Sequence, residues 1–178
     1  DPPAVRAKSA ALYDSGGNLL YEYNGEEQLP PASVTKIMTM LLVMEAVDSG
    51  QVSFDDMVTG SAYAASMGGT QIWLKEGEQL SLRDMLKAIA VASANDCAVA
   101  VAEFLAGSED AFVQKMNQRA KELGMKNTTF VNANGLDREG TQTITSAKDI
   151  GIMSAELLKH PTIKEFTTIW MDTIRNGE

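Results

Sequence analysis

Residues 33–47 read SVTKIMTMLLVMEAV, a strongly apolar stretch of the 178-residue chain. Its apolar side chains fall on most of the circumference of an α-helix: Ile37, Met38, Met40, Leu41, Leu42, Met44 and Val47. A helix that is apolar all round must be surrounded by other elements of the fold. The sequence therefore predicts a buried helix here, closed by the Ser49-Gly50 pair.

Strands and further helices are predicted on both sides of this helix. Residues 7–14 and 19–23 read as a hairpin around the turn SGGN, and residues 128–132 and 167–175 read as strands. Ser81, Ser108 and Ser146 each precede a helical pattern and are expected to cap it. The order predicts an α/β (α+β) fold in which both ends of the chain build a sheet and helices are inserted between them.

The composition excludes several classes of function. The net charge is -9, and an acidic chain without basic runs argues against binding to nucleic acid or to anionic membrane surfaces. One cysteine and one histidine rule out an intrachain disulfide, a cysteine-cluster metal site and a multi-histidine metal site. Cys97, Trp73 and Trp170 are expected to be packing residues, and His160 a cation at a helix C-terminus.

Ser33 and Lys36 are the first candidates for chemistry. Residues three apart lie on one face of a helix, so the hydroxyl and the amine can approach each other. Serine needs a base to become a nucleophile, and a buried lysine with a lowered pKa can be that base. The alternative is a capping serine followed by a solvated lysine, which fits poorly with a buried helix.

Ser93 and Asn95 form the second candidate group, at a break between two apolar helices. A hydroxyl and an amide at this place could relay a proton and hold a substrate carbonyl. Taken alone, the pair reads equally as the end of one helix and the cap of the next. A buried Ser-x-x-Lys in the same chain favours the functional interpretation.

Together these motifs resemble the low-molecular-mass penicillin-binding proteins, the serine-type D-alanyl-D-alanine carboxypeptidases of peptidase family S11. The resemblance extends over nearly the whole chain and rests on the following segments: AKSA at 7–10, PASVTKIMT at 31–39, SMGGT at 66–70, SAND at 93–96, FVQKMN at 112–117, LGM at 123–125 and NANGL at 132–136. Several of these are specific to that family rather than to serine hydrolases in general.

The resemblance implies the role of each candidate residue. Ser33 would be the acylated nucleophile, with its backbone N–H as one oxyanion-hole donor, and Lys36 the general base. Ser93 would pass a proton to the departing D-alanine, and Asn95 would bind the amide carbonyl of the substrate and help to orient Lys36. It implies peptidoglycan stem peptides as substrate, β-lactam antibiotics as covalent inhibitors and no metal or organic cofactor.

The sequence departs from the family because it contains no Lys-Thr-Gly. In the family that element recognises the terminal carboxylate of the substrate, and its strand supplies the second oxyanion donor. We therefore expect residues 1–178 to be the N-terminal, C-terminally incomplete portion of one β-lactamase/transpeptidase-like catalytic domain. A sheet subdomain would comprise about 1–55 and 140–178, and a helical subdomain about 56–139. A second polypeptide segment carrying Lys-Thr-Gly would pack on this chain.

The family also implies an exported, extracytoplasmic protein, attached to the outer face of the cell membrane through a C-terminal segment absent here. Two other functions are alternatives to the carboxypeptidase. A β-lactamase shares the serine and the lysine, but no segment matches the deacylating-glutamate loop of class A enzymes. An inactive fragment that only binds peptidoglycan or antibiotic would explain the lack of Lys-Thr-Gly.

Overall fold

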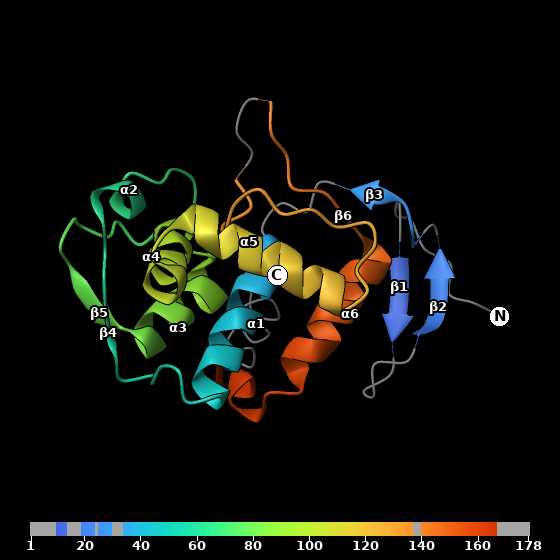
Figure 1. Ribbon diagram of the computed structural model, residues 1–178, viewed down its shortest axis with the longest axis horizontal. Helices are drawn as coiled ribbons and strands as arrows, with labels where there is room; N and C mark the ends of the chain where they lie inside the picture. Colours follow the sequence, from blue (N-terminus) through green and yellow to red (C-terminus); the bar gives the residue numbers. More distant parts are fainter. Residues whose placement is uncertain (1–9, 14–18, 24, 30–33, 137–139, 167–178) are drawn as a thin grey trace, which may run out of the picture.

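The computed structural model describes residues 10–13, 19–23, 25–29, 34–136 and 140–166 (Figure 1). Its α-helices are α1 (Thr35–Asp48), α2 (Ala62–Ala65), α3 (Leu82–Ala92), α4 (Asn95–Ala106), α5 (Glu109–Glu122) and α6 (Ala147–Leu158). The strands are β1 (Ala10–Tyr13), β2 (Leu19–Tyr23), β3 (Gln28–Leu29), β4 (Met57–Thr59), β5 (Gln79–Ser81) and β6 (Thr145–Ser146), and a short 3-10 helix, η2, spans Pro161–Ile163.

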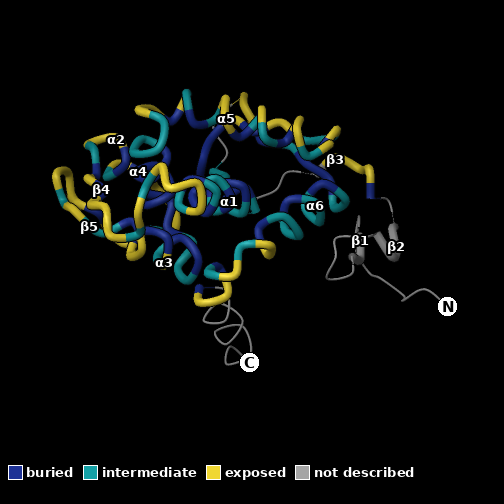
Figure 2. The backbone as a smooth tube through the Cα atoms, turned by 60° about the horizontal axis from the view of Figure 1, so that its bottom comes forward, coloured by how far each residue is buried: buried dark blue, intermediate teal, exposed yellow. Residues whose placement is uncertain are grey.

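The predicted buried helix is confirmed as α1. It contacts α3, α4, α5 and α6, and from residue 34 to residue 47 each position is buried or half-buried (Figure 2). Its core-facing side chains include Met38, Leu41, Val43 and Met44, all fully buried. The first turn of α1, which carries Lys36, is therefore held by packing on several sides.

Serine side chains cap the starts of four helices: α3, α5 and α6, as the sequence predicts, and also α2, through Ser61. The hydroxyls of Ser81, Ser108 and Ser146 accept hydrogen bonds from backbone N–H groups three residues later, at 3.1, 3.1 and 3.2 Å. Each bond satisfies one of the backbone donors that the first turn of a helix leaves unpaired. These caps fix where α3, α5 and α6 start.

The described strands form short antiparallel pairs. β1 pairs with β2, which confirms the predicted hairpin, and β3 pairs with β6, so residues near 28 and 145 lie side by side. β4 pairs with β5, a ladder of three residues that the sequence did not predict. The predicted strand 128–132 is wrong, because only Thr129 forms a bridge there, with Ile144.

The predicted strand 167–175, with Trp170, lies outside the described residues, and the division into two subdomains remains a prediction. Trp73 is a correction: its side chain is 78% exposed, and it lies outside the strands with φ 61°. Cys97 is in the core as expected, fully buried in α4, and burial together with the neighbouring Asp96 raises the pKa of its thiol to about 12.

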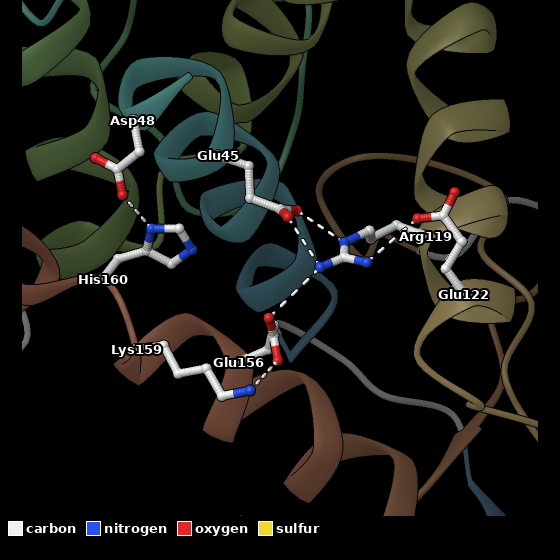
Figure 3. Close-up of polar contacts among 7 residues, drawn as sticks. All are labelled: Glu45, Asp48, Arg119, Glu122, Glu156, Lys159 and His160. Atoms are coloured by element: carbon white, nitrogen blue, oxygen red, sulfur yellow. Dashed lines mark hydrogen bonds and ion pairs between the residues drawn. The ribbon is translucent and has the colours of Figure 1, made fainter. Parts of the chain in front are cut away.

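A cluster of charges joins α1, α5 and α6 on the side of the molecule drawn in Figure 3. The Arg119 guanidinium is paired with Glu45 at 2.9 Å, Glu122 at 3.2 Å and Glu156 at 3.5 Å. Nearby, the ring of His160 is paired with Asp48. The histidine therefore follows α6 near its C-terminal end, as predicted, and its partner is a side chain at the end of α1.

Replacing Arg119 by methionine is expected to lower the free energy of unfolding by about 1–2 kcal/mol. The arginine side chain is only 22% exposed, and its removal leaves three carboxylates close together without their shared cation. Urea denaturation measures the change. Lys159→Met is the matched control, since that lysine also pairs with Glu156 but its side chain is 63% exposed, and it should change stability by less than about 0.5 kcal/mol. Equal effects of the two substitutions would contradict this role for Arg119.

Candidate active site

Lys36 and Ser93 meet although 57 residues separate them in the sequence. Lys36 is the second residue of α1 and is 4% exposed, and its Nζ donates a hydrogen bond to Ser93 Oγ at 3.0 Å. The structure thus rejects the interpretation of Lys36 as a solvated helix residue. It places the amine beside a hydroxyl through which a proton can pass.

Burial changes the protonation of Lys36. Removal of the ammonium from water lowers the pKa of Lys36 from about 10.5 to about 8. At pH 7 roughly a tenth of such lysines would be neutral, compared with a negligible fraction of solvated ones. A base with a pKa near the working pH is well suited to proton transfer.

The backbone at Ser93 explains how its side chain reaches Lys36. Ser93 ends α3 with φ 52° and ψ 39°, in the left-handed region that residues other than glycine rarely adopt. Ala94 returns to an extended conformation, and α4 then begins at Asn95. Strained residues of this kind are held by their surroundings and concentrate at functional sites.

Asn95 lies at the start of α4 and is almost fully buried. Its Nδ2 donates to the carbonyl oxygen of Gly68 at 2.9 Å, and its backbone N–H donates to the carbonyl oxygen of Thr70 at 2.8 Å. An amide nitrogen carries two N–H groups, and the bonds among the described residues use one of them, which leaves the other for a substrate carbonyl. The predicted orientation of Lys36 by Asn95 remains a prediction, since the described bond of Lys36 runs to Ser93.

Four segments that carry the family resemblance converge at this place. The Thr39 hydroxyl of α1 donates to the carbonyl oxygen of Ala133 at 2.7 Å, which fixes the turn 132–136 beside the start of α1. A Cβ placed on Gly69 would lie 2.7 Å from Asn95 Nδ2 and 3.1 Å from Leu136 Cδ2. Residues 34–39, 66–70, 93–96 and 132–136 are therefore neighbours in space.

The predicted nucleophile itself lies outside the described residues. Ser33 precedes the described start of the 34–48 segment by one residue, and its backbone N–H, the predicted oxyanion donor, is likewise not described. The structure thus brings together Lys36, Ser93 and Asn95 of the predicted site. Among the described residues, no group of three or more His, Cys, Asp or Glu side chains is placed to hold a metal ion.

Sequence reasoning missed Asp96 and Gly69. Asp96 is fully buried, and its carboxylate accepts hydrogen bonds from the backbone N–H groups of Ile72, Leu74 and Cys97 at 3.3, 2.8 and 2.9 Å. A signal existed in the SAND motif, where the carboxylate directly follows the candidate Asn95. Its partners, however, are backbone groups, which leave no mark in a sequence.

Replacing Lys36 by methionine is expected to raise the free energy of unfolding at pH 7 by about 2 kcal/mol, because burial of the ammonium is unfavourable. Between pH 8 and 10.5 the unfolded chain keeps a proton that folded Lys36 has released, so wild-type stability rises with pH. The advantage of the variant should therefore shrink across that window. Urea denaturation at pH 7 and pH 10 measures it, with Lys87→Met, at an exposed position of α3, as control. An advantage that is the same at both pH values would be evidence against a buried ammonium.

The sequence of this chain matches a family of known proteins. A D-alanyl-D-alanine carboxypeptidase family profile, peptidase S11, matches residues 1–176. The D-alanyl-D-alanine carboxypeptidase DacF of Bacillus subtilis is 53% identical over 175 residues, covering 98% of this chain and 44% of the relative. The chain thus spans less than half the length of that curated relative.

Solved structures agree with the predicted transpeptidase-like α+β fold. The D-alanyl-D-alanine carboxypeptidase DacD from Francisella tularensis superposes with a TM-score of 0.88 at 34% identity, over 93% of this chain and 40% of that one. Penicillin-binding protein D2 from Listeria monocytogenes, in its ampicillin-bound form, gives 0.75 at 35% identity, over 94% and 68%. The fold prediction is confirmed, and the chain belongs to the D-alanyl-D-alanine carboxypeptidase family, peptidase S11.

Proposed function

We propose that this chain carries the nucleophile, the base and the proton relay of a serine-type D-Ala-D-Ala carboxypeptidase. Its substrate would be the stem peptide of peptidoglycan, from which it removes the terminal D-alanine. The observation that carries the proposal is the 3.0 Å hydrogen bond from the buried Lys36 amine to Ser93, in a chain of this family.

The reaction proceeds in two steps. Neutral Lys36 takes the proton of the Ser33 hydroxyl while Ser33 Oγ attacks the carbonyl carbon of the penultimate D-alanine. The C–N bond to the terminal residue then breaks, and the proton reaches the departing amine through Ser93. Water, deprotonated by the same base, hydrolyses the acyl-enzyme and restores the Ser33 hydroxyl.

β-Lactams would acylate the same serine, because their strained ring amide stands in for the scissile peptide. Support comes from the Listeria monocytogenes relative, whose structures were solved in ampicillin-bound and cefotaxime-bound forms. Asn95 would hold the amide carbonyl of either ligand through the N–H that Gly68 leaves open.

Full activity is proposed to require a segment with Lys-Thr-Gly, which this sequence does not contain, to bind the terminal carboxylate. Loss of one oxyanion donor typically lowers a rate by about 10²–10³. The protein is further proposed to act outside the cytoplasm, anchored by a separate C-terminal segment. Among the described residues, no helix combines the length and apolarity that a bilayer span requires.

Release of D-alanine from a pentapeptide ending in D-Ala-D-Ala tests the function. The assay uses the protein together with a Lys-Thr-Gly segment, and a peptide ending in D-Ala-L-Ala is the control substrate. Release from the first peptide alone is expected. Rapid hydrolysis of a chromogenic β-lactam would favour a β-lactamase instead, and stable binding of antibiotic without D-alanine release would favour an inactive binding module.

A further inference from the structure

The buried carboxylate of Asp96 holds the segment 68–74 against the start of α4. Its two oxygens accept the backbone N–H groups of Ile72 and Leu74, on either side of Trp73, as well as the N–H of Cys97 in its own helix. Leu74 itself is buried, so the C-terminal end of the segment is fixed both by packing and by this carboxylate.

The other end of the same segment holds Asn95. The carbonyl oxygen of Gly68 can only accept a hydrogen bond, so it selects the orientation in which Asn95 presents Nδ2 and not Oδ1. The carbonyl oxygen of Thr70 accepts the backbone N–H of Asn95 as well. Position 69 must be glycine for this approach, because its φ is +69° and a Cβ would collide with Asn95 Nδ2 at 2.7 Å.

The hydrogen bonds accepted by Asp96, called the clamp below, are needed because the backbone of segment 68–74 is unfavourable by itself. Trp73 has φ 61°, a conformation that bulky side chains rarely adopt, and its exposed side chain contributes little packing. Residues 68–74 contain no helix or strand. Buried Met67 holds the N-terminal end of this segment, and the Asp96 carboxylate fixes the backbone on both sides of Trp73.

We propose that Asp96 and Gly69 are positioning residues for Asn95, which they hold with one amide N–H directed toward the substrate carbonyl. This inference rests on the proposed function, in which Asn95 binds that carbonyl. Neither residue touches the substrate. They act through the segment 68–74, whose Gly68 carbonyl sets the rotation of the Asn95 amide.

Two penicillins distinguish this role from a general structural one. Benzylpenicillin carries a side-chain amide carbonyl that Asn95 can hold, whereas 6-aminopenicillanic acid has a free amine there. The measurement is the second-order rate constant of acylation, in the enzyme complete with its Lys-Thr-Gly segment. In Asn95→Ala, acylation by benzylpenicillin should fall about 10- to 100-fold, and acylation by 6-aminopenicillanic acid should change less than about threefold.

Gly69→Ala is expected to reproduce this selective loss, because the added Cβ displaces Asn95. Gly50→Ala is the matched control: its φ is +76°, so the backbone strain is similar, but a Cβ there meets open space. Gly50 lies beyond the far end of α1 from Lys36, and its variant should acylate like the wild type with both compounds.

Asp96→Asn is expected to show the same selective loss. One carboxylate oxygen becomes an NH₂ group, which can only donate and therefore cannot accept the backbone N–H that the oxygen accepted. Asp149→Asn is the control, since Asp149 is also buried and accepts bonds from the Asn127 N–H at 2.9 Å and the Thr128 hydroxyl at 2.7 Å. If Asp96→Asn does not fold, Gly69→Ala still decides the question, because Gly69 is exposed.

The combination with Asn95→Ala completes the test. Gly69→Ala added to Asn95→Ala should cause less than about a threefold further loss, since both act through one amide. Equal losses with both penicillins, or no loss, in Gly69→Ala and Asp96→Asn would overturn the clamp. If Asn95→Ala slows acylation by both penicillins equally, Asn95 does not bind the side-chain carbonyl. Asp96 and Gly69 would then have no substrate-binding group to position.

Discussion

Ser33→Ala is expected to abolish acylation by penicillin, with a fall in rate of about 10⁴-fold or more. In the proposed mechanism the substitution removes the oxygen that forms the ester, whereas Lys36, Ser93 and Asn95 are unchanged. Incubation with a fluorescent penicillin, followed by digestion, should label a peptide that contains Ser33 in the wild type and no peptide in the variant.

Ser49→Ala provides the control for this experiment. Ser49 caps the opposite end of α1, where its hydroxyl donates to the Ala46 carbonyl at 3.1 Å, far from the amine of Lys36. This variant should take up label at the wild-type rate. Normal labelling of Ser33→Ala would show that another residue is the nucleophile.

Lys36→Arg is expected to slow acylation by about 10²–10⁴-fold while the protein still folds. Arginine keeps the positive charge and can still donate to Ser93, but its pKa is too high for it to accept a proton from Ser33. Stopped-flow acylation across pH 6–10 measures the effect. The wild-type rate should rise with pH around a midpoint near 8, where buried Lys36 loses its proton, and the variant should lack this rise.

Lys87→Arg is the matched control, because Lys87 is exposed on α3, the helix that ends at Ser93. It should keep both the rate and the pH profile of the wild type. A variant Lys36→Arg that acylates at a near-normal rate would remove Lys36 from the role of base.

The helical part of the fold could be predicted because its signals are local. A serine three residues before an acidic residue marked the starts of α3 and α6, and a stretch without a polar face marked α1. β4 and α2 were missed because three or four residues cannot establish a periodicity. Their conformation is set by the partner strand and by packing, which the local sequence does not contain.

The candidate site could be predicted as a set of residues but not as a geometry. The motifs predict Lys36 and Ser93 as site residues, but the 3.0 Å contact between them depends on how α1 packs against α3 and α4. Trp73 was wrongly assigned to a packed segment, because its exposure follows from a backbone that Asp96 holds. A side chain that binds backbone N–H groups can have a partner of any residue type. Such contacts therefore cannot be predicted from a sequence motif.

The fully buried Cys97 has a practical consequence for studying the molecule. A thiol without solvent contact and with its pKa raised to about 12 should ignore alkylating reagents while α4 stays in the core. Since it is the single cysteine of these 178 residues, its rate of alkylation would measure how often the core opens transiently. For the same reason, a cysteine engineered onto the surface could be labelled with a fluorophore without labelling of the native Cys97.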